Sequence, residues 1–123
     1  MGGSVGCFGH TGAPLTVHYF PLEAETLTAV TAENILKRSG PCVLTSSQDV
    51  GNVNRLLDSA EPTTDPFGGS FVRLRVDVQT DGKSQLRALM DQEGVVRDAS
   101  GGVRRLRPER LRDLVAFINA HCS

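Results

Sequence analysis

Apolar and polar positions alternate most clearly along the chain between residues 71 and 78. In an extended strand, successive side chains point to opposite faces. One face would carry Val72, Leu74, Val76 and Val78, and the other Phe71, Arg73, Arg75 and Asp77. This pattern predicts a strand with one buried face and one face in water, which an antiparallel sheet allows.

Turn signals and shorter alternating runs extend the predicted sheet. Asp81-Gly82 favours a tight hairpin, because Asp-Gly tolerates positive φ. The return strand would place Leu86, Ala88 and Met90 on one face. Further strands are expected at 95–97, 103–106, 15–20 and 42–45, so that residues 71–106 form an antiparallel meander.

Three segments have the pattern of helices. The clearest begins near Pro108, and a shorter one over 32–38 follows Thr31 as its N-cap. Another follows Ser46 and Ser47 and ends before Pro62. Two apolar stripes support the longer helices: Leu111, Leu114, Val115 and Ile118 in the last one, and Val50, Val53, Leu56 and Leu57 in the one before. We expect the last helix to pack across the sheet.

These elements predict one α+β domain over residues 15–123, preceded by a flexible Gly-rich leader over 1–14. The order of elements does not repeat, and 123 residues suffice for one hydrophobic core. We expect an antiparallel sheet of four to six strands with two or three helices packed on one face.

Charge and hydropathy narrow the class of protein. The formal charge of −1 disfavours a dedicated nucleic-acid binder. Residues 1–69 carry seven acids against three bases, whereas residues 70–123 carry ten bases against seven acids. No apolar run is long enough to span a membrane, and no hydrophobic signal core stands at the N-terminus.

Arginines concentrate near the C-terminus. Six of them fall between 97 and 112, against only Asp98 and Glu109. One interpretation is a solvated face with local ion pairs. The functional interpretation is a patch that docks an acidic surface of another protein, with Arg97, Arg104, Arg105 and Arg107 as contact residues. Nucleic acid is disfavoured because no aromatic residues interleave with the bases. Lipid headgroups are a further option if Cys7 is an anchor.

Phe67 is the second contact candidate. It lies in the loop predicted over 61–70, between Pro66 and Gly68-Gly69. Such a residue is either a lid over the core or an anchor for a partner, and a single aromatic favours the lid.

Three cysteines allow two interpretations. Cys42 begins a predicted strand and Cys122 ends the last helix, so the two could meet in a bridge that closes about 80 residues and stabilises the fold by about 4 kcal/mol. The alternative is three reduced thiols in a cytosolic protein. Cys7 follows Ser4-Val5-Gly6, which suggests a lipidation site or simply part of a Gly-rich leader.

No motif predicts catalysis, a metal or a cofactor. Cys7 and His10 have metal-ligand spacing and His121 adjoins Cys122, but paired knuckles are missing. The thiols have no evident base with an orienting third group. The glycine-rich stretches lack the phosphate-loop patterns.

We therefore expect a non-enzymatic protein-binding module, of the inhibitor or immunity type, in the periplasm or anchored to a bacterial membrane by lipid rather than in the cytoplasm. Loop 61–70 and the arginine-rich end would contact the partner. Two alternatives remain: a small thiol-dependent enzyme or redox sensor using Cys7 or Cys122, and a cytosolic regulatory domain that binds nucleic acid through the arginines.

Overall fold

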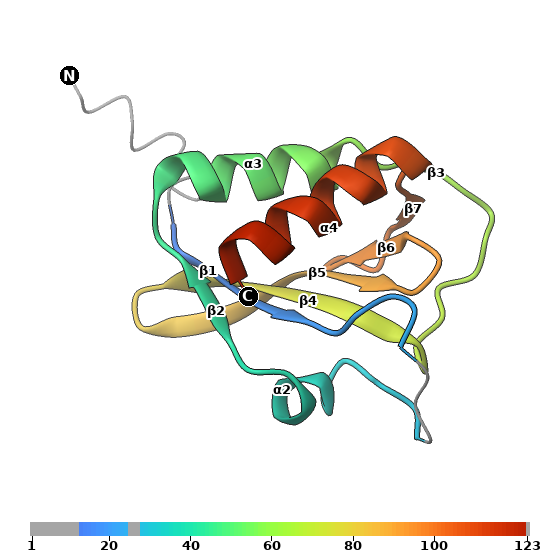
Figure 1. Ribbon diagram of the computed structural model, residues 1–123, viewed down its shortest axis with the longest axis horizontal. Helices are drawn as coiled ribbons and strands as arrows, with labels where there is room; N and C mark the ends of the chain where they lie inside the picture. Colours follow the sequence, from blue (N-terminus) through green and yellow to red (C-terminus); the bar gives the residue numbers. More distant parts are fainter. Residues whose placement is uncertain (1–12, 25–27, 123) are drawn as a thin grey trace.

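The computed structural model describes residues 13–24 and 28–122, which form an α+β fold with one seven-stranded sheet (Figure 1). The strands are β1 (Leu15–Tyr19), β2 (Cys42–Leu44), β3 (Glu61–Pro62), β4 (Val72–Thr80), β5 (Lys83–Asp91), β6 (Val95–Asp98) and β7 (Val103–Arg105). The helices are α2 (Ile35–Arg38), α3 (Ser47–Asp58) and α4 (Pro108–Cys122).

The strands lie in the order β2-β1-β4-β5-β6-β7-β3, and every neighbouring pair is antiparallel. The predicted meander is confirmed as β4 to β7. The expectation of four to six strands is too low, because Glu61 and Pro62, which lie within the predicted loop 61–70, pair with Arg105 and Arg104 at one edge. A proline is tolerated there because an edge strand needs hydrogen bonds on only one side.

Helices α3 and α4 lie side by side over one face of the sheet (Figure 1). The stripes predicted for them supply buried residues to the space between the layers. The main core cluster is completed by residues from six strands or strand ends and includes Leu15, Val17, Leu44, Leu74, Val76, Ala88, Met90, Val96 and Leu106. The last helix packs across the sheet as the sequence predicted.

Two helices share one face, as expected, and the short third helix, α2, lies on the opposite face (Figure 1). Ile35 is fully buried there, in a second cluster with Val30, Val72 and Leu89. Arg75, which points to this face, donates from Nη1 to the carbonyl of Ala32 over 2.6 Å. These two contacts hold α2 and the residues just before it against β4.

Two register shifts in the β4–β5 pair change which side chains share a face. The first lies between Val72 and Leu74, and the second lies opposite Arg87. A bulge of this kind inserts one residue and breaks the simple alternation. Val72 and Leu86 therefore belong to the second cluster, not to the main core with their expected neighbours.

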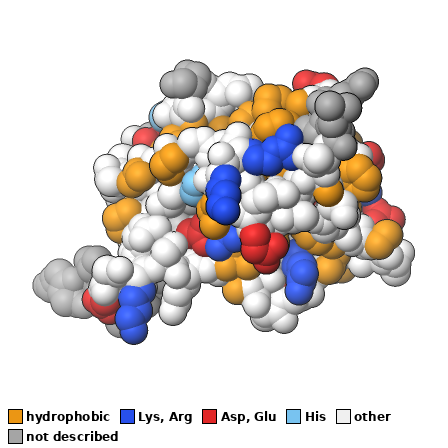
Figure 2. All heavy atoms as spheres, turned by 90° about the horizontal axis from the view of Figure 1, so that it is seen from below, with side chains coloured by type: hydrophobic (Ala, Val, Ile, Leu, Met, Phe, Trp, Pro, Cys, Tyr) orange, Lys and Arg blue, Asp and Glu red, His pale blue; other side chains and the backbone are white. Residues whose placement is uncertain are grey.

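The face that the alternation assigned to water is largely covered. His18, Arg73 and Asp77 are buried on it. Figure 2 shows this side of the molecule, where basic and acidic side chains lie next to each other with hydrophobic ones around them. Asp77 is held by Arg75, whose Nε lies 3.0 Å from the carboxylate. The prediction of a wet face is wrong because α2 and the loops before β4 pack on it.

The last residues of α4 meet the edge strand β2. The sulfur atoms of Cys42 and Cys122 lie at disulfide distance, with their Cα atoms 5.4 Å apart. The two residues that the sequence suggested could meet are thus neighbours. Within 13–24 and 28–122, no helix has the length and apolar character needed to cross a bilayer.

Candidate functional site

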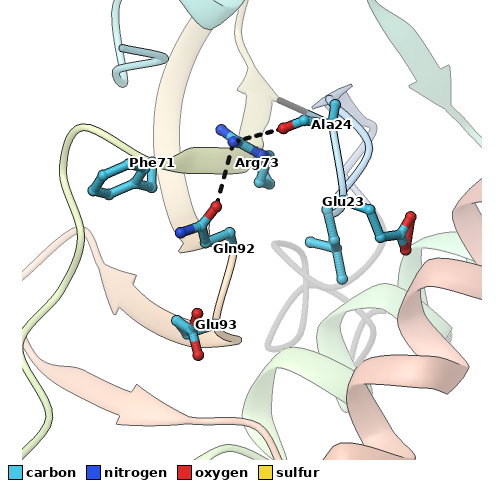
Figure 3. Close-up of a pocket in the computed structure, with 7 residues that line it drawn as sticks. Glu23, Ala24, Phe71, Arg73, Gln92 and Glu93 are labelled. Carbon is cyan, nitrogen blue, oxygen red and sulfur yellow. Dashed lines mark hydrogen bonds between the residues drawn. The ribbon is translucent and has the colours of Figure 1, made fainter. Parts of the chain in front are cut away.

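A surface hollow of about 520 Å³ lies where the end of β1, the start of β4 and the β5–β6 turn come together (Figure 3). We call it the Arg73 hollow. Its lining residues are Leu22, Glu23, Ala24, Phe71, Arg73, Gln92 and Glu93. Loop 21–24 forms one side, and Phe71 with the turn residues forms the other.

Phe71 forms one wall of this hollow and is 50% exposed. Its backbone is nevertheless fixed, because its amide donates to Gly68 O over 2.9 Å and its carbonyl accepts from Gln92 N over 3.0 Å. A parallel bridge to Val30 adds a third constraint. The ring is therefore held in solvent by a rigid backbone, an arrangement suited to contact with another molecule.

Arg73 lies at the base of the hollow and is only 2% exposed. Its Nη2 donates to Ala24 O over 3.2 Å and to Gln92 Oε1 over 3.4 Å, as the dashed lines of Figure 3 show. Its Nη1 donates to Val72 O over 3.1 Å. A single guanidinium thus ties loop 21–24 to the β5–β6 turn across the hollow.

The charge of Arg73 has no carboxylate partner in the described part of the chain. Its hydrogen-bond acceptors are neutral, and its carbon Cζ lies 5.6 Å from the centre of the Phe20 ring. Its Nε is buried and finds no acceptor among those residues. Buried charges are normally paired, so this guanidinium is the least compensated charge at the site.

The β5–β6 turn is held by the buried carboxylate of Asp91. Its Oδ1 accepts from the amides of Glu93 over 2.9 Å and Val95 over 3.0 Å. Its Oδ2 accepts from Gly68 N over 2.8 Å. Asp91 therefore positions both Gln92 and the loop that leads to Phe71.

Two exposed glutamates, Glu23 and Glu93, stand at the rim. In Figure 3 the carboxylate of Glu23 points toward α4 and away from Arg73. Glu23 and Leu22 also line a second, more apolar hollow of about 440 Å³ together with α4, whose lining residues there are Leu111, Arg112, Val115, Ala116 and Asn119. The two hollows are thus neighbours that share Leu22 and Glu23.

Phe67 is half-buried and packs against the second core cluster. Its contacts match the lid interpretation of the sequence. The more exposed aromatic is Phe71, which the sequence analysis did not name as a contact residue. The signal was present, since the alternation placed Phe71 on the polar side of the strand.

The four arginines predicted to form one patch do not share one surface. Arg105 and Arg104 are adjacent in β7, so their side chains leave opposite faces of the sheet. Arg104 donates to Ala60 O over 3.4 Å, and Arg105 forms an ion pair with Asp65. Arg107 lies near Glu61 and Glu109, and Arg97 is exposed on β6. Exposed pairs of this kind contribute little to stability.

The thiol and metal candidates are placed as follows. Cys122 faces Cys42 at disulfide distance. Cys7 and His10 lie outside the described residues. Within the residues that the structure describes, no three side chains of the metal-ligating types gather in one place.

His18 is buried on the face of the sheet that α2 covers, and it lies beside Arg75 and Asp77. Burial lowers the pKa of its imidazole, the charge of Arg75 lowers it further, and the Asp77 carboxylate opposes both. Its Nδ1 has no hydrogen-bond partner within the described ranges. The neutral imidazole is therefore the favoured form in the folded protein.

No protein-family model, curated protein or solved structure matches the chain.

Proposed function

We propose that the protein is a non-enzymatic protein-binding module whose contact surface is centred on Phe71 and the Arg73 hollow. The observation that carries this proposal is the half-exposed ring of Phe71 beside a hollow of about 520 Å³. Exposed aromatic residues at a hollow are the kind that dominate binding energy in protein interfaces.

The rigidity of the walls supports the same proposal. Asp91 accepts from two amides of the β5–β6 turn and from Gly68 in the loop before β4, and Arg73 ties that turn to loop 21–24. A preformed surface loses little conformational entropy on binding. Leu22, shared with the hollow against α4, extends the apolar part of the contact.

Loop 61–70 keeps a role in this proposal because it joins the site through Gly68 and leads directly into Phe71. Phe67 acts there as the support beneath the loop rather than as the contact. The exposed Arg105 and Arg107 would lie outside the centre and act on association through their charge.

We further propose that the protein works outside the cytoplasm, in an inhibitor or immunity role. The disulfide-distance pair Cys42 and Cys122 supports an oxidising compartment, since such bonds persist there. Lipid attachment at Cys7 would hold it at a membrane surface.

A photo-crosslinking residue in place of Phe71, in the full chain within its own host, tests the contact surface. We expect one discrete crosslinked protein that is absent when the same residue replaces Leu36, which is 41% exposed on α2. Equal products from both positions, or none from position 71, overturn the proposal.

A further inference from the structure

We propose that the Arg73 hollow receives a carboxylate of the partner protein, with an apolar side chain next to that carboxylate lying against Phe71 and Leu22. This inference rests on the proposed function and adds the chemistry of the contact. A peptide C-terminus and an acidic side chain are two sources of the same group.

The guanidinium of Arg73 is the reason for choosing a carboxylate. It is 2% exposed, donates to neutral acceptors, and keeps its Nε without a partner in the described part of the chain. Its present hydrogen bonds to neutral oxygens are already charge-assisted, but they leave the buried positive charge without a counter-charge. A carboxylate would therefore improve on the acceptors that Arg73 has now.

Gln92 is the contact that a carboxylate would replace. Its Oε1 lies 3.4 Å from Nη2, the longest of the three hydrogen bonds that Arg73 makes within the described ranges. Gln92 is half-buried and lines the hollow, so its side chain can leave without breaking the sheet. The carbonyls of Ala24 and Val72 would remain and keep the guanidinium oriented.

The acidic rim opposes this ligand. Glu93 and Glu23 are exposed, and exposed charges are screened by water and salt. They would weaken the binding of the carboxylate without preventing it. Removing one of these negative charges should therefore raise the affinity. Glu93→Gln is expected to raise the affinity for a carboxylate about twofold to fivefold, the range of an exposed charge interaction.

A substitution within the chain tests, with no ligand added, whether a carboxylate partner for Arg73 stabilises the protein. Gln92→Glu places a carboxylate where the amide oxygen now lies. We expect Gln92→Glu to raise the Tm at neutral pH relative to Gln85→Glu, the same change at an exposed position of β5. A Tm no higher than that of Gln85→Glu overturns the inference.

Binding is tested by NMR chemical-shift perturbation with three dipeptides: Ac-Ala-Leu with a free C-terminus, Ac-Ala-Leu-amide, and Ac-Leu-Glu-amide. Concentrations up to about 10 mM are needed, because ligands with few contacts bind weakly. We expect the free acid, the glutamate peptide or both to shift the amide signals of Phe71, Arg73 and Gln92, and the leucine amide to leave them unchanged. Shifts from the free acid alone identify a C-terminus as the source.

The Gln92→Glu variant is the control for the site. We expect it to weaken carboxylate binding at least about tenfold, as loss of one charged contact does, whereas Gln85→Glu leaves it unchanged. Equal shifts from the amide, no shifts from any peptide, or unchanged binding to Gln92→Glu overturn the inference. Crosslinking at position 71 tests the proposed function separately. A failure of the carboxylate site can therefore be told apart from a failure of the proposed contact surface.

Discussion

The backbone amide of Gly68 donates a hydrogen bond to the buried carboxylate of Asp91 over 2.8 Å. This bond joins the loop before β4 to the turn between β5 and β6. Since Phe71 and Gln92 lie on these two segments, the shape of the Arg73 hollow depends on it.

Replacing Asp91 with Asn is expected to destabilise the fold by about 2–4 kcal/mol. The amide would accept fewer of the three backbone hydrogen bonds, and a buried charged acceptor is costly to replace. Urea unfolding measures this loss. Asp81→Asn, in the exposed hairpin turn at φ 52°, is the control, because Asn tolerates positive φ. Equal stability of the two variants would contradict the role of Asp91.

Gly68→Ala is expected to destabilise the protein by about 1 kcal/mol more than Gly69→Ala, because the site is already closely packed. A Cβ atom at Gly68 would lie 3.2 Å from Asp91 Oδ2, whereas one at Gly69 meets nothing within 4 Å. Thermal unfolding of the pair of variants gives the comparison. A larger effect at Gly69 would show that the loop is not held through Asp91.

The cysteine pair gives a prediction that mass spectrometry checks. Alkylation of the unfolded but unreduced protein, prepared without the proposed lipid, is expected to add one group, on the remaining cysteine, Cys7. Reduction is expected to add two more and to lower stability by up to about 4 kcal/mol, because a bond across 80 residues restricts the unfolded chain. Three groups on protein that was never reduced would show that Cys42 and Cys122 are not bridged.

His18 makes stability depend on pH. Because burial lowers its folded pKa below the ordinary value of 6.5, the unfolded chain takes up a proton first as the pH falls. The contribution of His18 is therefore present above pH 6.5 and is lost as the pH falls from 6.5 through the lower folded pKa. Urea unfolding between about pH 5 and 8 measures this.

His18→Gln is expected to flatten that pH dependence, because it removes the buried imidazole. An identical pH profile for the wild-type protein and His18→Gln would contradict the assignment.

The sequence predicted the parts of the fold that periodicity controls. The stripe of α4 and the alternation along β4 and β5 identified the main core, because helix and strand periods determine which side chains share a face. The meeting of Cys42 and Cys122 also followed from the expected packing of α4 on the sheet.

The site was harder to predict because it depends on departures from regular alternation. The bulges beside Arg73 and Arg87 turn the side chains of Val72 and Leu86 to the other face of the sheet, and no local sequence pattern predicts these bulges. The burial of Arg73 follows from loop 21–24, which is remote in sequence. Closeness in sequence did not place the arginines on one surface, because the strand neighbours Arg104 and Arg105 leave opposite faces.

The most direct test of the proposed contact surface is a titration calorimetry measurement with the partner identified by crosslinking. We expect Phe71→Ala to weaken binding at least about tenfold, as loss of an aromatic interface anchor does. Val43→Ala, at a site that is 58% exposed on the edge strand β2, should bind as the wild-type protein does. Wild-type affinity of the Phe71→Ala variant would contradict a contact surface centred on Phe71.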